Sequence, residues 1–286
     1  MKADYKNWVP KSMVNGLIAG TVAALILFIL FGATDMILEG TPRLICAVLF
    51  GVGTLALLFF AVWMAALHRT FDYNGKRKLA KTIIEGTADY LKIPDGGVGL
   101  DVGCGSGALT IACAKRNPGA TVVGCDIWSG AYKAVFTQKR CEENAAAEGV
   151  TNVRFEEGNA IELPFPDETF DAVTAAFGIR NFQDLDRGLS EMCRVLKKGG
   201  HLSIVELTQP VGFPMRQLFK VYSHTVLPIY GRLISKDRSA YEYLTATIEA
   251  FPQGERMVEI LHRAGFTEAS FRRLTFGICT LYTATK

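Results

Sequence analysis

The stretch "LDVGCGSGALT" (residues 100–110) decides the fold of this chain. An apolar run ends at three closely spaced glycines, Gly103, Gly105 and Gly107, and a helix-forming run follows them. Glycine adopts positive φ angles and lets a ligand approach the backbone closely. A helix that begins just after such a turn offers unpaired N–H groups to a ligand. The stretch therefore predicts a strand, a ligand-binding loop and a helix.

Two acidic residues restrict the class of ligand that this loop could bind. Asp101 precedes the first glycine, and the glycine spacing is GxGxG rather than the GxGxxG of dinucleotide-binding loops. A carboxylate at Asp101 would repel a pyrophosphate, whereas it suits the ammonium or sulfonium group of S-adenosylmethionine. Asp126 ends the next apolar run, where it can accept hydrogen bonds from ribose hydroxyls. A nicotinamide-dependent oxidoreductase is the weaker alternative.

Strand-like and helix-like segments alternate after the loop. We expect helices over 76–93, 108–117, 129–149 and 184–200, and strands over 97–103, 120–127, 152–158, 170–177 and 201–207. This alternation is typical of an α/β fold with a doubly wound, mostly parallel sheet.

The Asp, the glycine loop, the second-strand acid and the turn "GNAIELPF" (158–165) together resemble the class I S-adenosylmethionine-dependent methyltransferases. The resemblance implies a Rossmann-like fold with seven strands, S-adenosylmethionine as the cofactor, and an adenine near the 158–165 turn. It also implies that a helical insertion at about 210–255, between the fifth strand and the last two strands, covers the substrate as a lid. Cys104, inside the loop, is expected to pack rather than to act as a nucleophile. The implied cofactor contacts are Asp101, Gly103, Gly105, Ser106, Gly107, Asp126, Ile127, Asn159, Ala160 and Ala176.

The later half of the chain narrows this resemblance. "AAFGIRNFQDLDRGLSEMCRVLKKGGHLSIVEL" (175–207) and "LFKVYSHTVLPIYGRLISKDRSAYEYLTATIEAFP" (218–252) are similar to the ubiquinone/menaquinone biosynthesis C-methyltransferases, which act on a quinol ring. The similarity is greatest to the menaquinone branch. It implies that Arg180 and Asn181 lie where the substrate meets the cofactor.

The chemistry of such a reaction gives these residues roles. A ring carbon attacks a methyl group more readily once the adjacent hydroxyl has lost its proton. Arg180 could stabilise the phenolate, and Asn181 could orient the hydroxyl or a water acting as base. Asn181 could also cap the helix expected from about Asp184. His224 is a candidate proton acceptor, with a packed core histidine as the alternative, and Tyr243 is expected to pack in the lid.

The first 70 residues have a different character. Residues 12–34 and 44–67 carry no charged side chain, and each is long enough to cross a hydrocarbon core of about 30 Å. Basic residues flank both outer ends, which by the positive-inside rule places both termini in the cytoplasm. A cleaved signal peptide and a buried soluble hairpin are the alternatives. We expect a membrane anchor over 1–70 and a methyltransferase domain over 71–286.

Composition excludes other classes of function. The formal net charge is +3, and no clustered basic face indicates nucleic-acid binding. The seven cysteines form no CxxC pair and no zinc-ligand spacing, so free thiols and no metal site are expected.

The expected function is methylation of a demethylmenaquinol-type prenylated quinol at the cytoplasmic face of a membrane. The front of the chain lacks the N-terminal pattern usual in the quinol-methylating family, and residues 126–150 look more like membrane-anchored class I methyltransferases. Alternatives are therefore a membrane-anchored methyltransferase for another lipid or small molecule, and a binding protein without turnover. The expected partners are the prenylated quinol and the lipid bilayer, and the sequence allows a homodimer.

Overall fold

The computed structural model describes residues 2–7, 9–35, 37–128, 136–226 and 238–286. Contacts divide the chain into two compact units. The sheet unit is built from Thr82–Val226 and Glu242–Lys286, together with the residues up to Tyr5. The hairpin unit contains Lys6–Lys81 and, among the described residues, also 238–241. Each unit is described by itself below.

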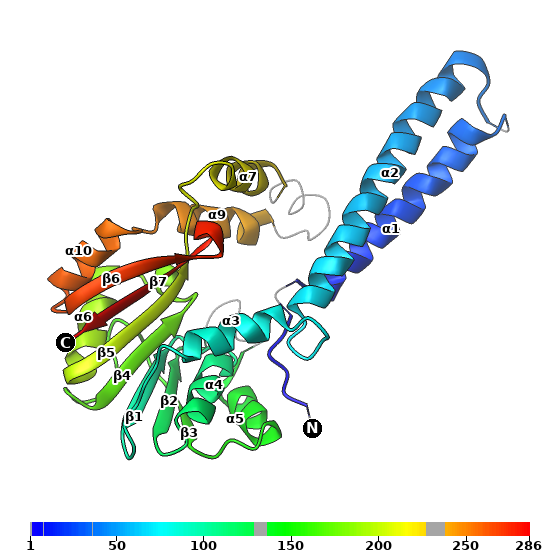
Figure 1. The fold of residues 1–286 in the computed structure, drawn as a ribbon. Coiled ribbons are helices and arrows are strands. Elements are labelled where there is room, and N and C mark those ends of the chain that lie inside the picture. Colours follow the sequence, from blue (N-terminus) through cyan, green and yellow to red (C-terminus); the bar gives the residue numbers. More distant parts are fainter. Residues whose placement is uncertain (1, 8, 36, 129–135, 227–237) are drawn as a thin grey trace. The chain divides into compact units, whose positions relative to one another are not determined.

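The sheet unit holds a seven-stranded sheet in the order β3-β2-β1-β4-β5-β7-β6 (Figure 1). The pairs between β1, β2, β3, β4 and β5 are parallel, while β7 runs antiparallel to both β5 and β6. The doubly wound, mostly parallel sheet expected from the sequence is confirmed. The strands are β1 (Val98–Val102), β2 (Thr121–Asp126), β3 (Val153–Glu157), β4 (Phe170–Ala176), β5 (Leu196–Leu207), β6 (Thr267–Leu274) and β7 (Cys279–Thr285).

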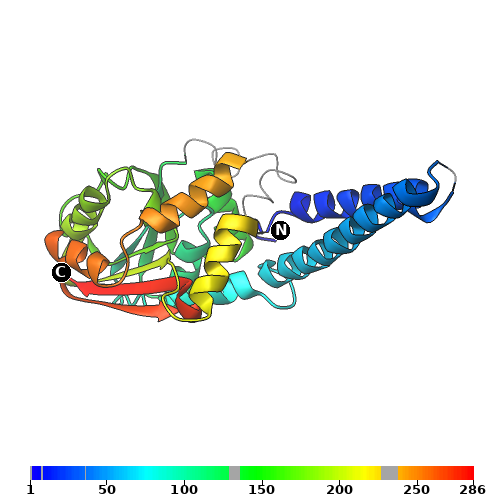
Figure 2. The same ribbon diagram turned by 90° about the horizontal axis from the view of Figure 1, so that it is seen from above.

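Helices connect the strands and lie on both sides of the sheet (Figures 1 and 2). The helix expected over 184–200 ends earlier, because residues 196–200 already belong to β5 and Leu196 pairs with Phe170 of β4. Of the helix expected over 129–149, residues 129–135 lie outside the described part of the chain. One helix, α3 (Leu79–Ala88), precedes β1. Those between later strands are α4 (Ala108–Arg116), α5 (Gln138–Ala147), the short η3 (Ile179–Asn181), α6 (Leu185–Val195) and α10 (Glu255–Arg263).

Two apolar cores hold these layers together. On one face, Leu189 and Met192 of α6 and Leu261 of α10 pack with strand residues such as Val173 and Ile204, all of them nearly inaccessible to solvent. On the other face, Ala88, Leu109 and Cys113 from α3 and α4 pack on Val122 and Ala172. Burial on both faces explains why the central strands read as continuous apolar runs in the sequence.

A helical insertion separates β5 from β6, as expected. Its described helices are α7 (Met215–Val221), η4 (Tyr222–Val226) and α9 (Arg238–Ala250), and the turn η6 (Thr275–Gly277) joins β6 to β7. The role of this insertion as a lid stays a prediction.

The hairpin unit consists of α1 (Lys11–Phe28), continued by η1 (Ile29–Ala33), and α2 (Gly40–Phe71). Small residues let the two helices approach closely, since a Cβ on Gly32 would lie 2.6 Å from the Ala47 Cα. The outward apolar side chains are exposed, for example Leu55 at 68%. That exposure is unlike the core of a soluble protein. By length and composition, Lys11–Ala33 and Gly40–Phe71 could each cross a membrane.

Candidate active site

The glycine loop lies between β1 and α4. Gly103, Gly105 and Gly107 all have positive φ, between 56° and 78°, a region that disfavours side chains with a Cβ. Gly107 is the N-cap of α4, so the first N–H groups of that helix point toward the loop. No atom lies within 4 Å of the place where a Cβ on Gly103 or Gly105 would stand. The loop therefore leaves open space beside its backbone, as a bound ligand requires.

Asp126, at the end of β2, holds the loop in place. One carboxylate oxygen accepts a hydrogen bond from Gly105 N at 2.9 Å, and the other accepts from Trp128 N at 2.9 Å. The indole of Trp128 donates in turn to the Gly105 carbonyl at 3.0 Å. A carboxylate has about four lone-pair directions, so Asp126 keeps capacity for further donors.

A cavity of about 450 Å³ opens beside this loop, within the size range of small-molecule sites. Eight residues expected at the site line it: Gly103, Gly105, Asp126, Ile127, Asn159, Ala160, Arg180 and Asn181. Five others expected there do not line it: Asp101, Ser106, Gly107, Ala176 and His224. The cavity thus brings together the loop, the ends of β2 and β3, and the segment after β4.

Asp101 lies beneath the loop rather than in the cavity wall. It is buried and accepts a hydrogen bond from Thr110 Oγ1 at 2.7 Å. Burial raises its pKa from 3.8 to about 7, against the opposing effect of the Thr110 hydrogen bond, and the nearby Asp126 charge adds to the rise. The structure places this carboxyl where it supports α4 and the loop from below.

Arg180 lines the cavity but is already paired. Its Nη1 donates to Glu206 Oε1 at 2.7 Å and also to the Phe177 carbonyl, while its backbone N–H donates to Glu206 Oε2 at 3.2 Å. Glu206 is completely buried at the end of β5. Burial raises the pKa of Glu206, and the Arg180 charge opposes that rise. The pair ties the end of β4 to the end of β5.

Asn181 is exposed in the cavity wall. The alternative that it caps the following helix is wrong, because Asp184 is the N-cap of α6 and accepts from Arg187 N at 2.9 Å. Among the described residues, the Asn181 carboxamide has no hydrogen-bond partner, so both its donor and acceptor are available to a ligand.

His224 lies on η4, outside the cavity lining. Its Nε2 is 2.8 Å from Glu249 Oε1, and its side chain is 50% exposed. The alternative of a packed core histidine is therefore wrong. Its role as a proton acceptor stays a prediction.

Several large or polar side chains also line the cavity without having been expected there, namely those of Trp128, Phe136, Phe177, Phe182, Gln183 and Tyr243. Tyr243, expected to pack in the lid, is 54% exposed in this wall. Phe177 has φ of 56°, an uncommon angle for a large side chain, and it directly follows β4. Glu206 was also missed, although an acid directly after the apolar "LSIV" run is a visible signal in the sequence.

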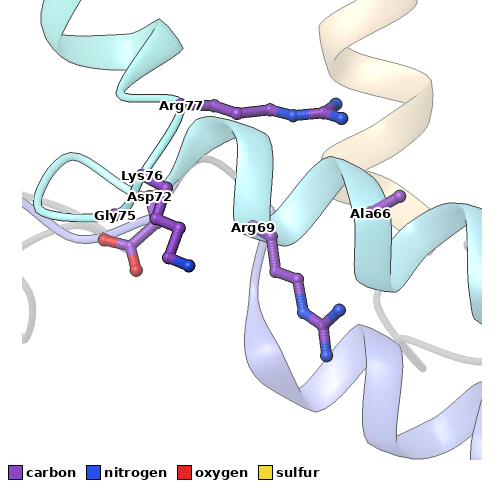
Figure 3. A pocket seen from close by; sticks show the side chains of 6 residues that line it. All are labelled: Ala66, Arg69, Asp72, Gly75, Lys76 and Arg77. Atoms are coloured by element: carbon purple, nitrogen blue, oxygen red, sulfur yellow. The ribbon is translucent and has the colours of Figure 1, made fainter.

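A second cavity, of about 410 Å³, lies in the hairpin unit at the end of α2 (Figure 3). Arg69, Lys76 and Arg77 line it together with Asp72, so its charge is net positive. Figure 3 shows the Arg69 and Arg77 side chains pointing in different directions. Because the two guanidinium groups do not converge, we assign no ligand to this cavity.

The fold and the glycine loop define a class I S-adenosylmethionine-dependent methyltransferase. The family model for the ubiE/COQ5 methyltransferase family matches residues 78–286, well over half of the chain. The chain belongs to this family, and its cofactor is S-adenosylmethionine.

Known proteins similar to this chain agree with that assignment. A demethylmenaquinone methyltransferase of Bacteroides fragilis is 52% identical over 189 residues, covering 65% of this chain and 74% of that protein. One of Porphyromonas gingivalis is 39% identical over 189 residues, covering 65% and 75%. A phosphoethanolamine N-methyltransferase of Haemonchus contortus, solved with S-adenosyl-L-methionine, superimposes with a TM-score of 0.51 at 16% identity. That likeness, covering 72% of this chain and 52% of the other, shows the fold alone.

Proposed function

We propose that this enzyme transfers a methyl group from S-adenosylmethionine to a ring carbon of a demethylmenaquinol-type prenylated quinol. The observation that carries the proposal is the 52% identity to the Bacteroides fragilis demethylmenaquinone methyltransferase. The part of the chain that the family model matches, residues 78–286, contains Arg180 and Asn181. The second candidate is methylation of another lipid or small molecule. It is favoured by residues 1–77, which the family model does not match.

The loop side of the cavity would hold the cofactor. The open space beside Gly103 and Gly105 fits a ligand that lies against the backbone, and Asp126 has lone pairs left for ribose hydroxyls. Ile127, Asn159 and Ala160 would surround the adenine. When bound, S-adenosylmethionine supplies an electrophilic methyl group on sulfur. Of the residues predicted to bind it, Asp101, Ser106, Gly107 and Ala176 would act by shaping the loop and strand ends, since they do not line the cavity.

Arg180 and Asn181 would serve the acceptor side. The Asn181 carboxamide can accept from a quinol hydroxyl or hold a water that takes its proton. Arg180 presents a guanidinium close to the place where phenolate charge would develop. His224 is proposed as a proton acceptor only in an arrangement that brings η4 to the cavity, because here it pairs with Glu249.

We further propose that residues 1–70 anchor the enzyme in a membrane and that residues 71–286 form the catalytic domain, with a helical lid at about 210–255, on the cytoplasmic face. This is supported by the apolar α1 and α2 and by the charges at their ends. Lys11 begins α1, and Arg69 lies in the last turn of α2. At the opposite end of the hairpin, Asp35 in the link between the helices instead forms an ion pair with Arg43 in the first turn of α2. A homodimer is compatible with the proposal and is not required by it.

The test is methyl transfer from labelled S-adenosylmethionine by the full-length protein in detergent, with reduced demethylmenaquinone as the acceptor. We expect methylated product from the wild type. Asn181→Ala should lower kcat by about tenfold or more without changing cofactor affinity, because it removes an orienting group. Gln217→Ala, which removes an exposed carboxamide outside the cavity lining, is the control. Cofactor binding without any product would refute the quinol substrate and favour the second candidate.

A further inference from the structure

Five large apolar side chains are exposed together on the sheet unit. Val211, Phe213, Leu218, Val221 and Phe276 are each 58–85% exposed. We call these five residues the α7 apolar patch. Large apolar side chains gathered in this way indicate a surface that is covered by another phase or molecule.

The members of the patch come from two segments that touch. Thr208, just after β5, donates from its backbone N–H to the Ile278 carbonyl at 2.8 Å and from its hydroxyl to the Gly277 carbonyl at 3.0 Å. A Cβ on Gly277 would stand 3.2 Å from the Pro210 Cα. Phe276 and Val211 are therefore each one residue from this contact. In Figures 1 and 2, α7 and the turn η6 lie next to each other.

Along the described residues from the end of β5 to η4 every charged side chain is basic, and Glu249 of α9, which approaches this segment, pairs with His224. No acidic residue occurs in the sequence between Glu206 and Asp237. Arg216 and Lys220, both exposed on α7, are four residues apart and flank Leu218. A short segment that mixes exposed aromatic and aliphatic side chains with cations has the composition of a surface that binds at an anionic lipid interface. A second copy of this chain would bring the same cations together, which is unfavourable.

The patch also lies at the same edge of the sheet as the cavity. Leu207 at the end of β5 pairs with Cys279 at the start of β7, so η6 stands at the carboxyl edge of the parallel strands, where the glycine loop also lies. Phe177, in the cavity wall, packs in one apolar cluster with Leu274 and Ile278, which flank η6. Apolar packing thus joins the cavity wall to the residues that flank η6, the turn that carries Phe276 of the patch.

We propose that the α7 apolar patch inserts into the interfacial layer of a bilayer that contains anionic phospholipids. It would hold the mouth of the cavity at the lipid surface, so that an acceptor with a lipid tail enters without crossing water. Insertion of the patch into the bilayer does not depend on which reaction the enzyme catalyses. The claim that a lipid-tailed acceptor enters there rests on the proposed function.

The first experiment measures insertion directly. The full-length protein is placed in nanodiscs of phosphatidylcholine and phosphatidylglycerol, with a fluorescent noncanonical amino acid in place of Phe213. Lys139, 84% exposed on α5, carries the same label in a control protein. Lipids that carry bromine on acyl-chain carbons close to the headgroup should quench the fluorescence of the label at 213 at least about twofold more than that of the label at 139. Equal quenching at the two positions would overturn the proposal.

The second experiment uses the variant Phe213→Ser/Leu218→Ser/Phe276→Ser, whose changes are all on exposed side chains and should leave melting temperature and cofactor affinity unchanged. We expect the KM for a long-tailed quinol in vesicles to rise about tenfold or more, and the KM for a short-tailed, water-soluble quinol to stay the same. Equal KM changes for both quinols would contradict the entry route. A wild type that methylates neither quinol would refute the proposed function, while the quenching result would still decide insertion. A dimer that the triple variant dissociates, with no quenching at 213, would assign the patch to a second copy instead.

Discussion

Replacing Arg180 with alanine tests the buried ion pair at the edge of the cavity. Arg180 has a side chain only 12% exposed, and its partner Glu206 is fully buried. Arg180→Ala would leave the Glu206 carboxylate without its only cationic neighbour among the described residues. Breaking a buried pair in this way destabilises proteins by about 3–5 kcal/mol. For a domain of this size, about 2–4 °C of melting temperature accompanies each kcal/mol, so we expect a loss of about 6–20 °C.

The loss should depend on pH in a defined direction. Burial raises the pKa of Glu206 above its ordinary value, and Arg180 opposes the rise, so removing Arg180 lets the pKa rise further. A carboxyl whose pKa is higher in the folded state contributes stability below its unfolded pKa, and that stability is lost as pH rises through the folded pKa. The deficit of Arg180→Ala relative to the wild type should therefore be smaller at pH 5 than at pH 8.

The assay is thermal unfolding of the full-length protein in detergent at pH 5 and pH 8. Arg180→Met/Glu206→Leu serves as the matched control, because removing both charges removes the unpaired carboxylate and should recover most of the loss. A melting temperature of Arg180→Ala within about 3 °C of the wild type at pH 8, or a deficit that grows toward pH 5, would refute this account of the pair.

Three further outcomes follow from the cofactor loop. Asp126→Asn should weaken S-adenosylmethionine binding, measured calorimetrically, by about tenfold to a hundredfold, because a charged acceptor for Gly105 N is lost. Gly105→Ala, at a φ of 56°, should destabilise the fold by about 1–2 kcal/mol, whereas Gly86→Ala on α3, with no atom within 4 Å, should be neutral or stabilising. Asp101→Asn should raise the melting temperature more at pH 8 than at pH 5, because a pKa of about 7 makes the native carboxyl lose stability as pH rises through that value. Equal gains at both pH values would contradict the Asp101 assignment.

Short stretches of sequence were enough to predict the strands and the glycine loop on which the site is built. Apolar runs located β1, β2, β3 and β4 within one or two residues, and three glycines located a loop whose φ angles only glycine adopts readily. The end of α6 was misplaced because "KKGG" is compatible with both a helix stop and a strand with an irregular register. Pairing of Leu196 with Phe170 decided between them, and such pairing joins residues far apart in the sequence.

What the sequence could not supply was the partner of each polar side chain. Asp101, expected to meet the cofactor, bonds to Thr110 one turn into α4 and is shut off from the cavity. Asn181 was expected either to orient the substrate or to cap the next helix, and the structure has Asp184 as the N-cap of that helix. Each pairing depends on which neighbouring element brings a donor or acceptor within about 3 Å of the side chain. Spacing along the sequence does not locate atoms in space that precisely, so the partners could not be predicted from it.

The pairing of Arg180 with Glu206 changes what this arginine can do in the reaction. A guanidinium bound to a buried carboxylate contributes little net charge to the cavity, so its effect on a phenolate would come from directed N–H groups more than from long-range attraction. Asn181 has no such partner among the described residues and is exposed in the same wall. If both act on one acceptor oxygen, Arg180→Lys, which keeps the charge but loses the planar donors, should lower kcat nearly as much as Asn181→Ala. A Lys variant with wild-type kcat would instead show that charge alone is needed at position 180.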